Sequence, residues 1–378
     1  MNFSPSSALK FLLPALALLA SCGPDDGSRA LARAREAVAA GRDKKARESF
    51  ETCLDKNPAN VEAAVGLALL LLRQGELPLA EERIEAAAAL DGESVDVKLL
   101  RAQIAWHRKD DEKAASLYAS LASDSSLSPA IRSQAWTELG IVQMAGNEFD
   151  LARVSFLHAM RLDKFNAATQ YHLGLLYRYA PFAYLNAARA AFEKFVYLSG
   201  ESDARVQKVC QTVIPALKQD IAQETASIPG VGTRNSALCA QSLSRADKAW
   251  KKGSFKTALA EYRKAEAADP LSVPAALGLA RALVKTDASK AAGKEALTHY
   301  RRACLLRPGA VAVFLEAGAL AERVGQIVTA REIYSRALAV QPTSADALDG
   351  LVRVLRKAGQ KKVASAYQAY RDALKEKP

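Results

Sequence analysis

The chain has 378 residues, of which 50% are hydrophobic and 25% charged, so it is globular and long enough for two folded bodies. Its net charge of +11 is uneven: residues 237–378 hold 25 Lys and Arg against 13 Asp and Glu, a net of +12, whereas residues 1–236 hold 27 against 28, a net of −1. This asymmetry predicts that the second half meets an acidic protein surface or an anionic lipid headgroup, although a solvated basic surface without a partner explains it as well. Because no nucleic-acid-binding motif accompanies the charge, nucleic acid is not expected as a partner.

The first residues have the pattern of a secretory signal. Lys10 precedes an apolar run at residues 11–20, which is shorter than the roughly 20 residues that cross a membrane. The run ends in Leu19-Ala20-Ser21-Cys22, which resembles the lipobox of bacterial lipoproteins. The resemblance implies a signal peptide at residues 1–21 and acyl chains on Cys22, although an ordinary cleaved signal with Cys22 nearby is the alternative.

Residues 22–28 then form the lipidated cysteine and a short tether. In the lipoprotein family, an Asp directly after the lipidated cysteine retains the protein in the inner membrane. Gly23 stands there in this chain. The resemblance therefore implies a bacterial cell-envelope protein that is lipid-anchored, faces the periplasm and belongs to the outer membrane.

A spacing of small and large residues recurs nine times in the rest of the chain. Two examples are Gly253, Ala258, Tyr262, Ala265 and Pro270, and then Gly325, Ala330, Tyr334, Ala337 and Pro342. The step from Pro308 to Pro342 is 34 residues, and the pattern resembles the tetratricopeptide repeat, a pair of antiparallel helices. The resemblance implies an all-α fold, an α-α superhelix that stacks helix pairs and presents a binding surface.

Composition divides this superhelix into two arrays joined by a short linker. We expect a first array of about five repeats at 29–200 and a capping helix at 201–224 with a kink at Pro215. A linker rich in Pro, Gly and Ser follows at 225–236, and a second array of about four repeats occupies 237–375.

Tetratricopeptide geometry implies that the first helix of each pair lines the concave side, where a partner would bind. In the first array this selects an apolar and aromatic groove: Arg35, Leu69, Arg73, Gln103, Trp106, His107, Ile141, Tyr171, Arg178 and Tyr179. A peptide with apolar anchors is the natural ligand for such a groove. The alternative is that these side chains pack against the next repeat or the capping helix.

In the second array the same rule selects a basic groove: Trp250, Lys251, Arg281, Lys285, Arg323, Arg353 and Lys357. Lys251, Lys285, Arg323 and Lys357 share one repeat position, so a row of cations could hold an acidic segment. That position also lies at the C-terminus of each first helix, where a cation offsets the helix dipole. Both explanations stay open.

Reactive groups are scattered. The four histidines fall in different repeats, and no metal-ligand or catalytic motif is present, so we expect no metal, no cofactor and no enzymatic activity. Cys53 and Cys304 have the spacing of core residues, whereas Cys210 and Cys239 flank the linker, and their pairing in a disulfide is left open.

These features together predict a lipid-anchored periplasmic scaffold that binds other proteins during the assembly of envelope complexes. The alternative is an outer-membrane glycan- or nutrient-binding lipoprotein. Some of those proteins resemble this chain in combining a lipobox with tetratricopeptide helices, but they insert an aromatic platform between repeats. No insertion of that size is present here.

Overall fold

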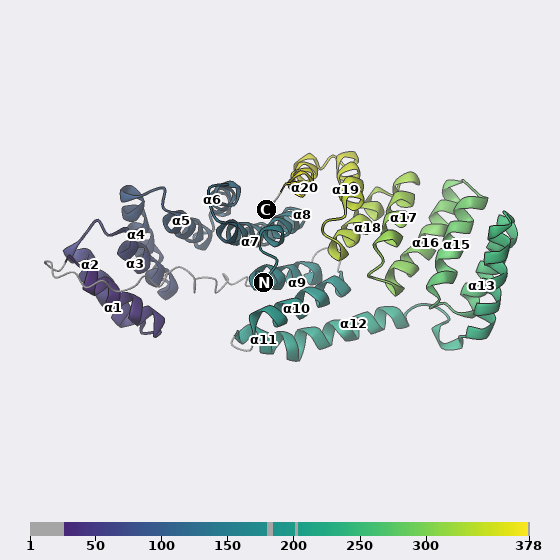
Figure 1. Cartoon of the computed structure of the whole chain (residues 1–378), viewed down its shortest axis with the longest axis horizontal. Helices are drawn as coiled ribbons and strands as arrows, with labels where there is room; N and C mark the ends of the chain where they lie inside the picture. The colour runs from purple at the N-terminus through teal and green to yellow at the C-terminus, as the bar shows by residue number, and fades with distance from the viewer. Residues whose placement is uncertain (1–25, 180–183, 201–202, 377–378) are drawn as a thin grey trace. The chain divides into compact units, whose positions relative to one another are not determined.

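The computed structural model describes residues 26–179, 184–200 and 203–376. Over these ranges the regular elements are helices, and no strand is present (Figure 1). The all-α helical-repeat fold expected from the spacing is thereby confirmed. Cys22 and the residues of the lipobox lie outside the described ranges, so their role stays a prediction.

Two compact units divide the chain between Thr169 and Gln170. The helices of unit 1 are α1 (Ser28–Ala39), α2 (Asp43–Lys56), α3 (Val61–Gln74), α4 (Leu77–Leu90), α5 (Val95–His107), α6 (Asp111–Ser123), α7 (Pro129–Ala145), α8 (Phe149–Leu162) and the start of α9 (Ala167–Tyr179). From α1 to α8, each helix packs against the one that follows it. The sequence placed the division between arrays later in the chain, at the linker.

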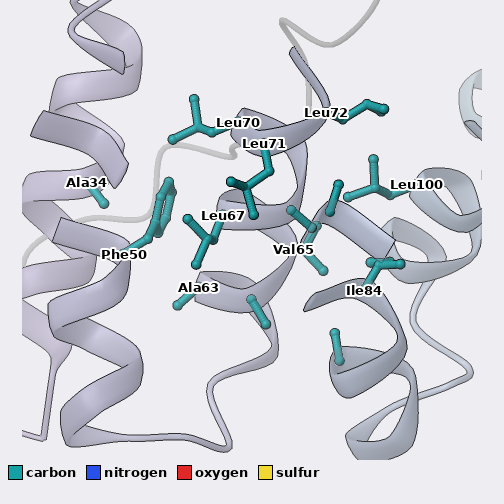
Figure 2. Close-up of a cluster of buried hydrophobic side chains, with 14 of the residues drawn as sticks. Ala34, Phe50, Ala63, Val65, Leu67, Leu70, Leu71, Leu72, Ile84 and Leu100 are labelled. Carbon is teal, nitrogen blue, oxygen red and sulfur yellow. The ribbon is translucent and has the colours of Figure 1, made fainter. Parts of the chain in front are cut away.

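The core of unit 1 alternates small and large side chains. Ala46 and Ala63 have no exposed surface, and the Phe50 ring projects from α2 towards α3 (Figure 2). Gly66 of α3 lies directly beneath this ring, because a Cβ placed there would overlap the Phe50 ring atoms. The aromatic residue therefore fills the space between one helix pair and the next, as dense packing requires.

Short polar side chains and glycines set the ends of many helices. Ser128 and Ser272 each accept a hydrogen bond from the backbone N–H three residues ahead, which caps α7 and α15 at their N-termini. Gly253 and Gly325 have φ values of 75° and 82° in the turn between the two helices of a pair. Only glycine adopts this left-handed conformation without strain, which explains the recurring glycine of the repeat.

Unit 2 begins with the rest of α9 and continues through two kinds of segment. The first segment holds α10 (Leu185–Ser199), α11 (Ala204–Lys208), the π-helical turn η2 (Val209–Val213), α12 (Ile214–Ala226) and the 3-10 turn η3 (Val231–Thr233). The second holds the repeat helices α13 (Ser236–Lys251), α14 (Phe255–Ala268), α15 (Val273–Thr286), α16 (Lys290–Leu306), α17 (Val311–Arg323), α18 (Ile327–Val340), α19 (Ala345–Lys357) and α20 (Lys361–Ala373).

The segment expected to cap an array packs on α9 and α10. The guanidinium carbon of Arg205 lies 4.9 Å from the centroid of the Tyr171 ring and 5.3 Å from that of Phe195. Helix α12 packs against α10, and its Leu217 is fully buried. Pro215 lies in the first turn of α12, directly after the π-helical turn, where its missing N–H is tolerated.

The predicted linker is ordered and is held to the second array. Arg234 donates two hydrogen bonds to Asp269, at 2.6 and 2.9 Å, and the Asn235 N–H donates one of 2.7 Å to the Ala268 carbonyl. Ile228 is buried as well. Residues 225–236 are thus attached to the end of α14, although most of them are exposed.

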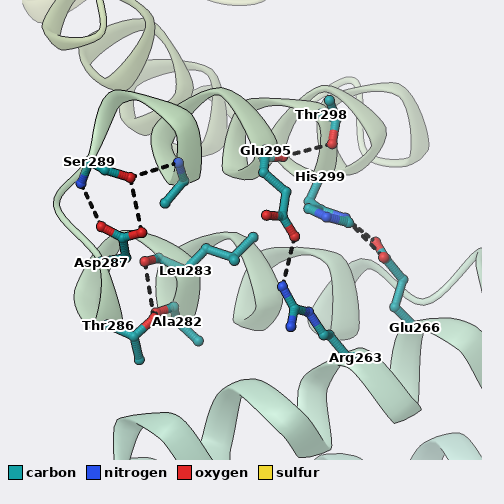
Figure 3. Close-up of polar contacts among 11 residues, drawn as sticks. Arg263, Glu266, Ala282, Leu283, Thr286, Asp287, Ser289, Glu295, Thr298 and His299 are labelled. Carbon is teal, nitrogen blue, oxygen red and sulfur yellow. Dashed lines mark hydrogen bonds and ion pairs between the residues drawn. The ribbon is translucent and has the colours of Figure 1, made fainter.

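Polar contacts join second helices of neighbouring repeats. Arg263 of α14 donates to Glu295 of α16 at 2.9 Å, and His299 Nδ1 lies 2.8 Å from a Glu266 oxygen (Figure 3). Arg302 adds a contact of 3.1 Å to the same Glu266 carboxylate. These carboxylates neutralise part of the positive charge on the second-helix side of unit 2.

Candidate functional site

Four cations of unit 2 occupy the same place in successive repeats. Lys251, Lys285, Arg323 and Lys357 lie in the last turns of α13, α15, α17 and α19, the first helices of their pairs. All four residues are exposed. We call them the cation row, and their placement matches the register expected from the repeat.

Members of the cation row differ in their partners. Lys357 Nζ lies 2.7 Å from a Glu322 carboxylate oxygen. Within the described ranges, Lys251, Lys285 and Arg323 form no ion pair. Three exposed positive charges are therefore left without a carboxylate from the described part of the chain.

An aromatic pair lies beside the row. The Trp250 and Phe255 rings meet edge to face, with centroids 5.0 Å apart and planes at 71°. Lys285 Nζ lies 5.3 Å from the Phe255 centroid, which is a cation–π distance. Phe255 was not among the expected site residues, although its place directly after the Gly253 turn was a signal for it.

The other predicted cations of this face, Arg281 and Arg353, are paired with carboxylates. Arg281 binds Glu316 through two hydrogen bonds of 2.7 and 2.9 Å, and these lower the pKa of the Glu316 carboxyl. Arg353 donates two longer hydrogen bonds, of 3.2 and 3.4 Å, to Glu322. Burial raises the pKa of Glu322, but the hydrogen bonds from Lys357 and Arg353 outweigh it, so the net shift is downward. Both carboxylates come from α17, the first helix of the eighth repeat.

A tyrosine forms a hydrogen bond with α13, the helix that carries Lys251. The Tyr262 hydroxyl donates a 2.6 Å hydrogen bond to Asp247 of α13, and burial together with this bond raises the tyrosine pKa. Tyr300 donates a similar bond of 3.0 Å to Glu316 of α17. Each bond fixes the orientation of a carboxylate on a first helix.

Some of the residues predicted for the first groove are buried in the core of unit 1. Trp106 is 7% exposed and Ile141 is 1% exposed, so neither offers its side chain to a partner in this structure. Their large apolar surfaces pack within unit 1, which is the alternative that the sequence left open. Leu69 is partly buried against the same core, and Gln103 is half-buried.

The polar residues predicted for unit 1 stay near the surface. Arg35 of α1 binds Glu62 of α3 through hydrogen bonds of 2.6 and 2.5 Å. Arg73 is exposed and lies 3.7 Å from Asp43. His107 is exposed, and partial burial together with the charge of Lys109 lowers its pKa.

Three further predicted residues lie on α9 within unit 2. Tyr171 packs against Phe195, with centroids 5.1 Å apart, and is covered by Arg205. Tyr179 is 45% exposed, and Arg178 lies over its ring at 5.2 Å. Of the ten residues expected in the first groove, the structure thus buries some, covers Tyr171 and leaves others exposed.

A crevice of about 220 Å³ opens between α12 and the second array of unit 2. Ile228 and Pro229 line one side, and Leu305, Phe314 and Ile333 line the other. Burial raises the pKa of the neighbouring Cys304 to about 12, so this thiol is neutral and unreactive at ordinary pH. The segment that follows α12 therefore forms part of the crevice wall.

Several kinds of site were searched for over the described residues. No group of three or more His, Cys, Asp and Glu side chains there is arranged to hold a metal ion. Nor does any helix in that part of the chain combine the length and apolarity needed to span a bilayer. Cys210 and Cys239, like Cys53 and Cys304, are free thiols.

Family comparison agrees with the repeat geometry. Two models described as tetratricopeptide repeat match the chain, one over residues 37–104 and the other over residues 243–311. The matched segments lie in units 1 and 2, and both consist of stacked helix pairs. The chain therefore contains tetratricopeptide repeats, which generally bind proteins or peptides and form scaffolds. Among curated proteins, none matches the sequence.

Three of the solved structures that match this chain are PilF, PilW and YrrB. PilF of Pseudomonas aeruginosa is 17% identical, covers 66% of this chain and 95% of its own, and gives a TM-score of 0.41. PilW, described as a type IV pilus biogenesis factor, is 18% identical over 55% of this chain and 96% of its own, with a TM-score of 0.43. YrrB, described as having an unusual peptide-binding site, is 14% identical over 47% of this chain and 89% of its own, with a TM-score of 0.35.

Proposed function

We propose that this protein is a scaffold that holds an acidic segment of another protein against the cation row of unit 2. The observation that carries the proposal is the pairing pattern on this face. Glu316 pairs with Arg281, and Arg353 and Lys357 share Glu322, whereas Lys251, Lys285 and Arg323 stay exposed without a carboxylate. A partner that supplies carboxylates would complete the charge pairing through charge-assisted hydrogen bonds.

The helix dipole alone does not account for the difference within the row. All four cations lie at the C-terminus of a first helix, so each offsets the dipole by about 0.3–1 kcal/mol. The dipole interaction does not require three of them to lack a carboxylate partner. A binding role for these three residues explains both their repeat position and their exposure.

The test is crosslinking in the native cell envelope, followed by mass spectrometry of the captured proteins. A triple variant, Lys251→Gln with Lys285→Gln and Arg323→Gln, should lose its main crosslinked partner while its melting temperature changes little. A matched control replaces three exposed cations of second helices, in Lys256→Gln with Lys294→Gln and Lys361→Gln, and should keep the partner.

Two outcomes would contradict the proposal. If the first triple variant lost much of its stability and kept its partner, the row would serve the helix dipoles and not binding. If both triple variants lost the partner equally, the total positive charge and not this face would be responsible. Binding should also weaken with added salt, since exposed charges are screened over about 10 Å at 0.1 M ionic strength.

We further propose that Cys22 carries the acyl chains that hold this scaffold at the outer membrane, facing the periplasm, where it assists the assembly of envelope complexes. Support comes from the lipobox-like Leu19-Ala20-Ser21-Cys22. Several acyl chains give stable anchoring, whereas one myristoyl chain does not. Cells that express the wild type should incorporate tritiated palmitate into the protein, and Cys22→Ser should abolish incorporation and release the protein from the membrane fraction. Unchanged labelling of Cys22→Ser would refute the anchor.

On unit 1, we propose a smaller contact surface than the sequence suggested. Its exposed members are Arg73 and His107, in the last turns of the first helices α3 and α5. Half-buried Leu69 and Gln103 lie on the same two helices. Replacing Leu69 by Asp should remove a crosslink to any partner bound there, whereas retention of every crosslink would exclude this surface.

A further inference from the structure

The excess positive charge of the second array lies at the turns inside its helix pairs. Four turns of three residues join α13 to α14, α15 to α16, α17 to α18 and α19 to α20. These turns, with five helical residues on each side, hold 14 Lys and Arg against 3 Asp and Glu, at 247–259, 282–294, 319–331 and 353–365. The rest of residues 237–378 holds 11 against 10. Almost all of the net charge of the array is therefore at these four turns.

The four turns lie along one edge of the array. Each helix from α13 to α20 packs against the one that follows it, so first and second helices alternate in direction through a continuous stack. In such a stack, the turns within pairs lie on one edge and the turns between pairs lie on the other. We call the edge formed by the four charged stretches the basic edge. The corresponding stretches of unit 1 hold 10 Lys and Arg against 9 Asp and Glu, at 35–47, 70–81, 103–115 and 141–153.

Helix stability does not explain the lysines at the starts of the second helices. Lys256 of α14, Lys290 of α16 and Lys361 of α20 lie in the first turn, where the helix dipole disfavours a cation. These three residues, which we call the turn lysines, are exposed, and none forms an ion pair with a residue that the structure describes. Second helices α2, α6 and α8 of unit 1 carry an acidic residue in the first turn, whereas α14, α16, α18 and α20 carry none. The turn lysines therefore act against the dipole, and a ligand would offset that cost.

The composition of the basic edge favours a lipid surface over an acidic protein segment. Ten of its 14 cations are lysine, a point charge that suits the diffuse charge of lipid headgroups, whereas arginine is favoured for paired contacts with single carboxylates. Val328, in the first turn of α18, is 67% exposed, more than any other large apolar side chain of the described second array. The half-buried Trp250 lies at the end of α13, and tryptophan is enriched at membrane interfaces. Apolar side chains among lysines are typical of surfaces that lie at the headgroup level.

We propose that the basic edge lies on an anionic lipid bilayer, with the turn lysines at the headgroups and Val328 in the interfacial region. Each lysine near an anionic surface adds to the attraction, and buried apolar area strengthens it. The proposal goes beyond the acidic segment proposed for the cation row, because the row lies at the ends of first helices and the turn lysines lie at the starts of second helices. It is also independent of acyl chains on Cys22.

The experiment measures cosedimentation of the full chain with vesicles. Every protein carries Cys22→Ser, so that acyl chains contribute to no measurement. One set of vesicles is phosphatidylcholine alone, and the other contains equal parts of phosphatidylcholine and phosphatidylglycerol. The ratio of the two partition coefficients is the lipid preference. Residues 1–21 are the same in every variant, so differences in this ratio come from the substitutions.

The turn-lysine variant combines Lys256→Gln, Lys290→Gln and Lys361→Gln. It should lose at least about tenfold of the lipid preference, since each lysine near an anionic surface is worth about fivefold. Its melting temperature should stay the same or rise, because the variant removes cations that oppose helix dipoles.

A matched control removes the same charge from the other ends of the same three helices. It combines Lys264→Gln, Arg307→Gln and Lys375→Gln, which lie towards or just beyond the C-terminal ends of α14, α16 and α20. Because distant charges are screened in salt, this control should keep the lipid preference within about threefold.

A second pair of variants tests the apolar residue. Val328→Asp removes the exposed valine and adds a negative charge to the basic edge, so it should lower the lipid preference by about fivefold. An acidic residue in the first turn should not destabilise α18. Val340→Asp is the matched control, because Val340 is 39% exposed at the other end of the same helix, and it should leave the preference unchanged.

Three results would overturn the proposal. If the turn-lysine variant kept its lipid preference, the basic edge would not face a bilayer, and loss of its main crosslinked partner in the cell envelope would then show that the edge binds an acidic protein. If the matched triple control lost as much preference, the total charge would be responsible. Equal effects of Val328→Asp and Val340→Asp would exclude contact at this edge.

Discussion

The contact between Gly140 of α7 and Phe156 of α8 gives the most direct test of the packing. A Cβ at Gly140 would lie 2.5 Å from Phe156 Cε1, 2.8 Å from Cδ1 and 2.9 Å from Cζ. The Phe156 ring has no exposed surface, so it has no open space into which to move. Gly140→Ala should therefore overpack the interface, at a cost of about 1–3 kcal/mol.

Helix propensity works in the opposite direction. Alanine is favoured over glycine inside a helix by about 1 kcal/mol, so the net loss for Gly140→Ala is about 0–2 kcal/mol. In a Phe156→Leu background, the ring is replaced by a shorter and more flexible chain, and Gly140→Ala should then stabilise by about 1 kcal/mol. The two substitutions should thus be coupled by about 1–3 kcal/mol.

The assay is urea denaturation followed by far-UV circular dichroism on the four proteins of this double-mutant cycle. Gly146→Ala, in the turn at the end of the same helix, is the control, because its φ is −77° and a Cβ there would lie 3.7 Å from the nearest atoms. It should be neutral or slightly stabilising. If Gly140→Ala had the same effect in both backgrounds, within about 0.5 kcal/mol, the proposed contact would be refuted.

Three further predictions concern burial, pH and one hydrogen bond. Ala330 is fully buried, so Ala330→Glu should bury an unpaired charge. The substitution should destabilise unit 2 by several kcal/mol and lower its melting temperature. Unchanged helicity and melting would contradict the repeat register. His158, stacked on Trp136 at 4.4 Å, has its pKa lowered to about 4, mainly by burial. The unfolded chain takes up this proton near pH 6.5, so the free energy of unfolding should be highest above pH 6.5 and fall towards pH 4, by on the order of 3 kcal/mol for this residue. Urea titrations at each pH should show a shallower fall for His158→Gln, and an identical fall would rule the effect out. Tyr262→Phe removes the hydrogen bond to Asp247 and should cost about 1 kcal/mol in thermal unfolding, whereas no change would show that water replaces it.

The helical repeat could be predicted because its signal lies in local spacing. Gly325, Ala330 and Tyr334 each have a fixed place, in the turn, at the helix contact and in the gap between repeats, and the structure confirms all three. The placement of α12 could not be predicted in this way. Whether its apolar face meets the first or the second array depends on tertiary contacts, and no periodicity records them.

The candidate site was predictable to a lesser degree. The repeat position of Lys285 follows from counting residues, but its unpaired state depends on which neighbouring carboxylates reach it. Glu322 pairs with Lys357, 35 residues away along the chain. Trp106 shows the converse, since a residue at a groove position is buried when neighbouring helices close over it. The repeat register predicts where a side chain lies on its helix, but whether that side chain is exposed depends on how the helices pack around it.

The position of Ile228 and Pro229 beside α16, α17 and α18 affects how unit 2 unfolds. In a solenoid whose repeats touch only their neighbours, terminal repeats can fray one at a time. Helix α12 packs against α10, and the residues that follow it, up to Pro229, lie beside α16, α17 and α18. Detaching this segment therefore breaks contacts with helices on both sides of it in the sequence. Mechanical pulling on unit 2 should therefore give fewer and larger rupture steps than an array of independent repeats, because the segment after α12 must detach before the helices on either side can separate.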